Sequence, residues 1–238
     1  MNNCTEERFL QDIENHEMEV LLDDGVYRHV KFSRGWSSVY QFSLVTWPGH
    51  LSISGDMGCY TFRRTNDMFG FFVTDKNDFN FNDNGISINP GYWSEKLEGV
   101  PGYNKGKVFN SELIVESIIS HIESYYEGCD FEDYKDPSTD DPFQSEEDLI
   151  SALKNEVNDY FEYKELDENR FVSAVDEFRS EIHEDFNLQD EWEWLETHEW
   201  SHHYIWCCYA IAYGVYKYNQ SMRINCESSI KSIKELDK

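Results

Sequence analysis

The most specific chemical pattern in the chain is His198-Glu199-Trp200-Ser201-His202, which matches HExxH. On a helix, two histidines four residues apart share a face and can hold a zinc ion. The adjacent glutamate then acts as general base toward a metal-bound water. One hypothesis is therefore a zinc-dependent hydrolase or metalloprotease, with His198 and His202 as ligands and Glu199 as the catalytic residue.

A zinc site of this kind also needs a third ligand. The residues after His202 do not extend the pattern to HExxHxxGxxH, and the later glutamates, Glu227 and Glu235, lie in a thin C-terminal tail. Glutamates are so dense before this point that a chance match beside a histidine is easily found. We favour the other interpretation, in which the histidines cap or flank the start of a helix and no cofactor is bound.

Negative charge is concentrated in the middle of the chain. The net charge is −27, of which residues 1–110 contribute −5, residues 111–200 contribute −24 and residues 201–238 contribute +2. Such a field repels phosphate, so we expect no direct binding of DNA or RNA by residues 111–200. The same field attracts a basic surface and also keeps the protein in solution. The expected partner class is therefore a basic protein.

Carboxylates recur every few residues along the helices expected in this region, with tryptophans between them near its end. They could follow the path of the phosphates in a nucleic-acid-binding protein, and the tryptophans could anchor the interface. The alternative is a solvated outer face whose tryptophans pack inward. The expected partner-binding residues are Glu146, Glu147, Asp148, Glu156, Asp159, Glu181, Glu184, Asp185, Glu191, Trp192, Glu193 and Trp194.

The first half of the chain predicts an antiparallel sheet. Apolar residues at helical spacing predict a helix over residues 5–20, and alternation then predicts four strands separated by tight turns, at residues 26–32, 38–46, 50–54 and 59–63. Asp56, between Gly55 and Gly58, is expected to bond nearby backbone amides in one of these turns. A short helix at residues 68–72 would pack on the sheet.

The second half predicts helices. They are expected at residues 111–126, 146–163, 167–184 and 202–218, with an exposed linker at residues 128–145. The last helix is apolar nearly all round, which is typical of a buried central helix. The predicted class is α+β, in which an N-terminal helix and a small antiparallel sheet precede an acidic, mainly helical C-terminal half. The predicted domains are a sheet-bearing domain at residues 1–109 and an acidic helical domain at residues 110–238.

Three features predict a cytoplasmic protein without a membrane segment. No apolar run approaches the roughly 20 residues that span a bilayer, and the N-terminus lacks the layout of a signal peptide. The six cysteines form no CxxC pair, so free thiols are expected.

Several segments of the chain resemble an uncharacterised family of phage- and prophage-encoded proteins. They are DDGVYRHVKF, the W-P-G-H-L…G-D-M-G core of the sheet region, the motif I-N-P-G-Y-W-S-E-K-L and the apolar run Y-I-W-C-C-Y-A-I-A-Y-G-V. The family carries no assigned activity, so the resemblance implies a genomic context. Small acidic phage proteins of this kind often resemble inhibitors of host defence, some of which mimic DNA.

Charge and resemblance together predict a non-enzymatic counter-defence protein of a phage or prophage. It would bind and block a basic, nucleic-acid-handling host protein of the CRISPR or restriction type. The alternatives are the zinc-dependent hydrolase above and a phage structural or assembly protein.

Overall fold

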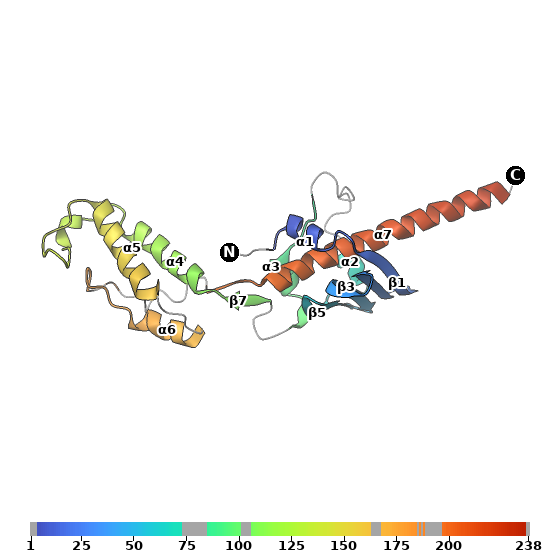
Figure 1. Ribbon diagram of the computed structural model, residues 1–238, viewed down its shortest axis with the longest axis horizontal. Coiled ribbons are helices and arrows are strands. Elements are labelled where there is room, and N and C mark those ends of the chain that lie inside the picture. Colours follow the sequence, from blue (N-terminus) through green and yellow to red (C-terminus); the bar gives the residue numbers. More distant parts are fainter. Residues whose placement is uncertain are drawn as a thin grey trace. The chain divides into compact units, whose positions relative to one another are not determined.

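A computed structural model of the chain describes residues 4–72, 85–100, 106–162, 168–184, 186, 188 and 197–236, with side chains described up to residue 224. The chain forms two compact units. Unit 1 comprises Met1–Lys107 and Trp200–Lys238, and unit 2 comprises Val108–Glu199. The predicted α+β class is confirmed, because an N-terminal helix and a six-stranded antiparallel sheet are followed by a mainly helical remainder (Figure 1).

The sheet of unit 1 is a meander in which each strand pairs antiparallel with its neighbours in sequence. The four predicted strands correspond to β2–β5, and β1 and β6 extend the sheet at its two edges. The strands are β1 (Glu17–Asp24), β2 (Tyr27–Arg34), β3 (Ser37–Trp47), β4 (His50–Gly55), β5 (Gly58–Arg63) and β6 (Leu97–Gly99).

The helix predicted over residues 5–20 is wrong in its second half. Helix α1 (Glu6–Asp12) starts at Thr5, whose hydroxyl accepts the backbone N–H of Arg8, and it ends at Ile13. The chain then turns and forms β1 along the edge of β2. The apolar spacing fits both conformations locally. Pairing with the backbone groups of β2 favours the strand, because those groups need partners.

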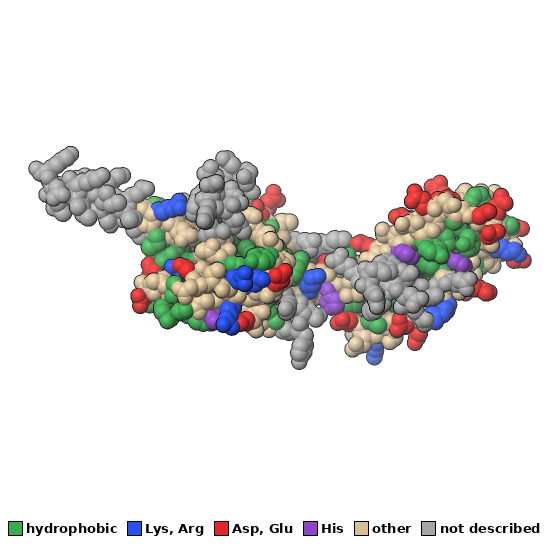
Figure 2. Space-filling view, turned by 180° about the vertical axis from the view of Figure 1, so that it is seen from behind, with side chains coloured by type: hydrophobic (Ala, Val, Ile, Leu, Met, Phe, Trp, Pro, Cys, Tyr) green, Lys and Arg blue, Asp and Glu red, His purple; other side chains and the backbone are tan. Residues whose placement is uncertain are grey.

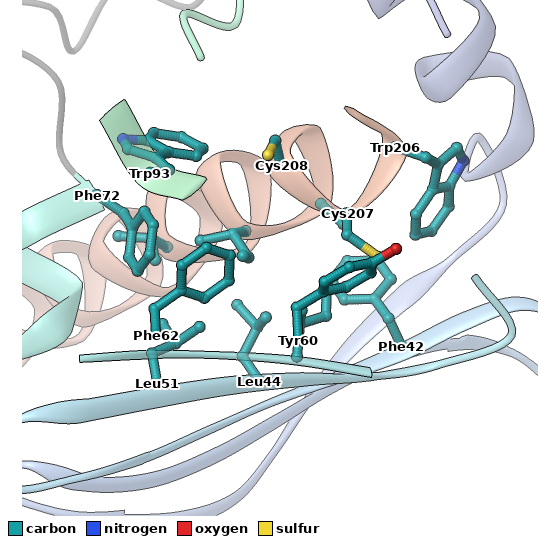
Figure 3. Packing of buried hydrophobic residues seen from close by; sticks show 14 of the residues in the cluster. Phe42, Leu44, Leu51, Tyr60, Phe62, Phe72, Trp93, Trp206, Cys207 and Cys208 are labelled. Carbon is teal, nitrogen blue, oxygen red and sulfur yellow. The ribbon is translucent and has the colours of Figure 1, made fainter. Parts of the chain in front are cut away.

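The core of unit 1 lies between the sheet and the long helix α7 (His202–Leu236). Alternate residues of β2–β5 are buried on one face of the sheet, and Figure 3 shows Phe42, Leu44 and Leu51 rising from the strands toward the helix that carries Cys207 and Cys208. The short helices α2 (Met68–Phe72) and α3 (Pro90–Ser94) add aromatic side chains to this core.

A glycine allows α7 to approach the sheet closely. A Cβ atom added at Gly214 would lie 2.6 Å from Cδ1 of Leu44 and 3.2 Å from Cε2 of Phe32. Gly214 follows Ile211 on the apolar face of the helix, where Val215 and Ile211 are buried. The absent side chain therefore permits contact between the helix backbone and the sheet side chains.

The division of the chain differs from the predicted domains at residues 1–109 and 110–238. Its first boundary, at Lys107–Val108, lies close to the predicted one, but the C-terminal residues return to the sheet-bearing unit. The physical reason is that a helix apolar nearly all round needs a broad apolar surface to cover it. The buried face of the sheet supplies that surface for α7.

Unit 2 is built from α4 (Ser111–Tyr126), α5 (Glu146–Glu162) and α6 (Glu168–Glu177), with a short 3-10 helix, η1 (Phe131–Asp133), between the first two. The predicted bounds of α4 are confirmed, and the helix is capped by Asn110, whose side chain accepts the backbone N–H of Leu113. The core of unit 2 is formed by apolar stripes at four-residue spacing, namely Ile114, Ile118, Ile122 and Tyr126 of α4 and Leu149, Leu153, Val157 and Phe161 of α5.

The chain forms a short strand at each of the two points where it passes from one unit to the other. These strands are β7 (Lys107–Phe109) and β8 (His198–Trp200), which pair with each other. Among the helices that the structure describes, none has the combination of length and apolar character needed to cross a membrane.

Candidate protein-binding surface

The HExxH pattern does not lie on a helix. His198 and Glu199 belong to strand β8, and His202 is the first residue of α7. The premise that both histidines share one helical turn is therefore wrong. Within the described part of the chain, no three His, Cys, Asp or Glu side chains are grouped so that they could hold a metal ion.

His198 has partners within unit 2. Its Nδ1 atom lies 2.7 Å from the hydroxyl oxygen of Thr197, and its Nε2 atom lies 3.4 Å from a carboxylate oxygen of Glu168. The ring also makes an edge contact with Phe109. Burial, together with the neighbouring His203, lowers the pKa of His202. His198 thus lies at the start of strand β8, and His202 lies at the start of helix α7.

Asp56 accepts a backbone N–H, but from a neighbouring strand and not from its own turn as expected. Its carboxylate accepts the backbone N–H of Tyr40 at 2.9 Å. Tyr40 has a φ of 56°, in the left-handed region that non-glycine residues rarely adopt. Asp56 therefore stabilises an unusual backbone conformation in β3.

Charge separates the two units. From the sequence, unit 2 holds 29 acidic and five basic residues, for a net charge of −24. In unit 1 the two segments contribute −5 and +2, for a net charge of −3. On the face drawn in Figure 2, carboxylate side chains surround the α4–α6 unit, whereas both signs mix over the sheet-bearing unit. Unit 2 is therefore the source of the negative field.

One predicted partner-binding carboxylate belongs to the framework of unit 2. Glu156 on α5 accepts the hydroxyl of Ser180 at 2.6 Å and also the backbone N–H of Glu181. Ser180 is buried. These bonds draw the chain out of helical geometry after α6, which explains why α6 ends at Glu177 and not at the predicted residue 184.

Glu146 and Asp148 also have internal partners. Glu146 accepts the backbone N–H of Gly128 at 3.0 Å, which ties the turn after α4 to the start of α5. Asp148 accepts the hydroxyl of Ser145 at 2.7 Å, and Ser145 in turn accepts the backbone N–H of Asp148 at 3.1 Å. This reciprocal arrangement caps the N-terminus of α5.

The remaining predicted residues fall into two groups. Glu147, Asp159, Glu181 and Glu184 are exposed on unit 2. Asp185, Glu191, Trp192, Glu193 and Trp194 lie outside the described residues. Exposed carboxylates are therefore available to a partner on α5 and on the segment after α6.

The basic residues of unit 2 cannot neutralise these carboxylates. Lys135 bonds Asp140 at 3.0 Å, Lys154 pairs with Glu123, and Arg179 donates to two backbone carbonyls. With 29 acidic side chains against five basic ones, most of the negative charge of unit 2 has no compensating cation within the unit.

A groove with a volume of about 630 Å³ lies between α4, α5 and α6. Its apolar lining comes from Val115 and Ile119 of α4, Phe161 of α5 and Phe171 of α6. Its polar lining is Ser111, Glu112, Glu116, Asn158 and Glu162. The groove lining thus combines four apolar side chains with three carboxylates.

The three groove carboxylates were not among the predicted site residues. A signal was present in the sequence, because Glu112, Val115, Glu116 and Ile119 recur at i, i+3, i+4 and i+7 and so form a second stripe on α4. This stripe lies beside the buried one. Only the packing of α5 and α6 distinguishes a lined groove from an ordinary solvated face.

Comparisons with protein-family models, with curated proteins and with solved structures found no match. Function must therefore be inferred from the chemistry of this chain.

Proposed function

We infer that this protein is a non-enzymatic binding protein that captures a basic, nucleic-acid-handling protein through unit 2. The observation that carries this inference is the separation of charge, with −24 on unit 2 and −3 on unit 1. Solubility does not explain this separation, because the same net charge spread evenly over both units would keep the protein equally soluble.

Physical chemistry links this charge to a basic partner. Mutual repulsion among the carboxylates of unit 2 costs folding free energy, and a basic surface relieves it on binding. Long-range attraction also raises the association rate and favours partners of the opposite sign. Proteins that handle nucleic acids carry such basic surfaces, because they must neutralise phosphates.

The biological role we propose is that of a phage or prophage counter-defence protein acting in the cytoplasm of the host. It would block a CRISPR complex or a restriction enzyme by occupying its nucleic-acid path with carboxylates. The family resemblance of the W-P-G-H-L…G-D-M-G core supports the phage context. The free thiols of Cys4, Cys59, Cys129, Cys207 and Cys208 fit a reducing compartment.

Affinity capture from a host lysate at low and high salt tests this function. The full chain should retain a basic nucleic-acid-handling protein at low salt and lose it as salt rises. Charge reversal of Glu147, Asp159 and Glu181 to lysine should abolish capture, because these side chains are exposed on unit 2.

The matched control reverses three exposed acids of unit 1, Glu14→Lys, Glu17→Lys and Glu19→Lys, which should leave capture unchanged. Equal losses in the two sets would contradict a role for unit 2. Capture of virion components in place of a nucleic-acid-handling protein would favour the assembly alternative. The hydrolase alternative required His198 and His202 on one helix, whereas His198 lies on strand β8.

A further inference from the structure

The groove of unit 2 has two chemical features that point to the same ligand. Its apolar lining has two aliphatic side chains, Val115 and Ile119, and two aromatic ones, Phe161 and Phe171. Its remaining lining includes Glu112, Glu116 and Glu162, and no basic side chain is among the described residues that line it. A ligand that satisfies both features must be apolar along its body and positively charged at its ends or edges.

Two helix ends of opposite polarity lie at the groove. α5 ends at Glu162, within the groove lining, and its last turn holds no basic residue. The C-terminus of a helix carries a partial negative charge that favours cations. The N-terminus of α4, at Ser111 and Glu112 of the same lining, carries the opposite partial charge. The two helix ends therefore offset one another, and the three carboxylates are the source of the attraction for cations.

The groove has room for side chains from one face of a larger ligand. Its volume of about 630 Å³ falls within the range of about 300–1,000 Å³ that is usual for small-molecule and cofactor sites. Lysine and arginine lay their methylene stems on apolar surface while their charged heads stay at polar groups. An amphipathic helix binds in such a groove through apolar residues at i, i+3, i+4 and i+7.

We propose that this groove binds a basic amphipathic helix of the partner protein. Apolar side chains of that helix contact Val115, Ile119 and Phe161, and its flanking lysines or arginines pair with Glu112, Glu116 and Glu162. This inference rests on the proposed function, because it names the part of the basic partner that unit 2 recognises.

Two synthetic peptides of equal charge test the proposal on the full chain. One has about 14 residues with leucine and lysine at amphipathic helical spacing, and in the other each leucine is replaced by serine. Fluorescence anisotropy should give at least about tenfold tighter binding for the leucine peptide. Its binding should also persist at a salt concentration that releases the serine peptide.

Matched charge reversals locate the contact. Glu162→Lys and Glu177→Lys each change the last residue of a helix, α5 and α6 respectively, and both side chains are exposed. A lysine is favourable at a helix C-terminus, so neither variant should unfold the unit. Only Glu162 lines the groove. We expect a roughly tenfold rise in Kd for Glu162→Lys and about twofold for Glu177→Lys.

Three results would overturn the groove proposal while leaving the proposed function standing. They are equal binding of the two peptides, equal effects of the two variants, and full competition by spermidine, which would indicate a small polycation as the ligand. The proposed function fails by a different result, namely lysate capture that is unaffected by charge reversal of Glu147, Asp159 and Glu181.

Discussion

Unit 1 and unit 2 each bury a continuous core of aromatic and aliphatic side chains, but they arrange charge in opposite ways. In unit 1, carboxylates meet cations, as in the pairs Asp12 with Arg8, Asp67 with Arg28 and Glu98 with Arg63. In unit 2, acidic residues outnumber basic ones 29 to five.

In unit 2, the side chains that stabilise the fold differ from those that are free to bind a partner. The apolar stripes of α4 and α5 account for the fold of unit 2, and an excess of exposed carboxylates opposes it. Some carboxylates of unit 2 nevertheless help the fold, because they accept backbone hydrogen bonds. The acidic surface therefore has two parts, a framework part represented by Glu156 and an exposed part represented by Asp159.

The largest expected effect tests whether the two cores are independent. Trp206 is fully buried in unit 1, contacts Phe9 and Phe42, and donates its indole N–H to Asp12 at 3.1 Å. Trp206→Ala should lower the unfolding free energy of unit 1 by about 3–5 kcal/mol. Hydrogen exchange measured by mass spectrometry should show lost protection in β2–β5 and unchanged protection in α4 and α5.

The reciprocal control is Leu153→Ala in the core of unit 2, with an expected cost of about 2–5 kcal/mol. It should expose α4 and α5 and leave the sheet protected. Loss of protection in both units from either substitution would show that they unfold as one.

A smaller effect distinguishes framework carboxylates from exposed ones on the same helix. Glu156→Ala leaves the buried hydroxyl of Ser180 and the backbone N–H of Glu181 without their acceptor, which should cost about 1–3 kcal/mol. Asp159→Ala, on the exposed face of α5, should stay within about 0.5 kcal/mol of the parent protein. Urea unfolding followed by far-ultraviolet circular dichroism measures both. Similar losses of unfolding free energy in the two variants would contradict the distinction between framework and exposed carboxylates.

The smallest effect concerns a carboxylate of unit 1 that has a cationic partner. Arg28 donates two hydrogen bonds of 2.9 Å to Asp67 and is largely buried. Burial alone would raise the pKa of Asp67, but the hydrogen bonds and charge of Arg28 outweigh burial and hold that pKa below its ordinary value. The ion pair therefore stabilises unit 1 above the unfolded pKa of about 3.9, and this stability is lost as pH falls through the lower folded value.

Because the Asp67 side chain is 44% exposed, solvent screening limits this contribution to about 1 kcal/mol. Urea unfolding monitored at β2–β5, at about pH 7 and about pH 3, should show a smaller loss of stability on acidification for Asp67→Asn than for the parent protein. Glu14→Gln, an exposed change in the same unit, is the control. The same acid sensitivity in all three proteins would contradict the role of the ion pair.

Local periodicity was enough to predict much of the secondary structure. The four central strands, α4 with its bounds Ser111–Tyr126 and the position of α5 follow from apolar residues at spacings of two or four. The concentration of charge in the middle of the chain also follows from composition alone.

The candidate surface could be predicted only in part. The exposed positions of Glu147 and Asp159 agree with the predicted surface, whereas Glu146, Asp148 and Glu156 have internal partners. The role of Asp148 could have been predicted from the spacing of Ser145 and Asp148, which is typical of a helix cap. The roles of Glu146 and Glu156 could not, because amphipathic spacing places a carboxylate on a helix face without specifying the distant groups that will reach it.

What the sequence by itself determined is therefore the α+β class, most of the local elements and the location of the charge. Only the tertiary structure decided that residues 17–24 form a strand, that α7 covers the sheet, that HExxH spans a strand and a helix start, and that Glu112, Glu116 and Glu162 line a groove. The physical reason is that local patterns are set by neighbours in the chain, whereas strand pairing, helix coverage and groove formation depend on surfaces supplied by distant residues.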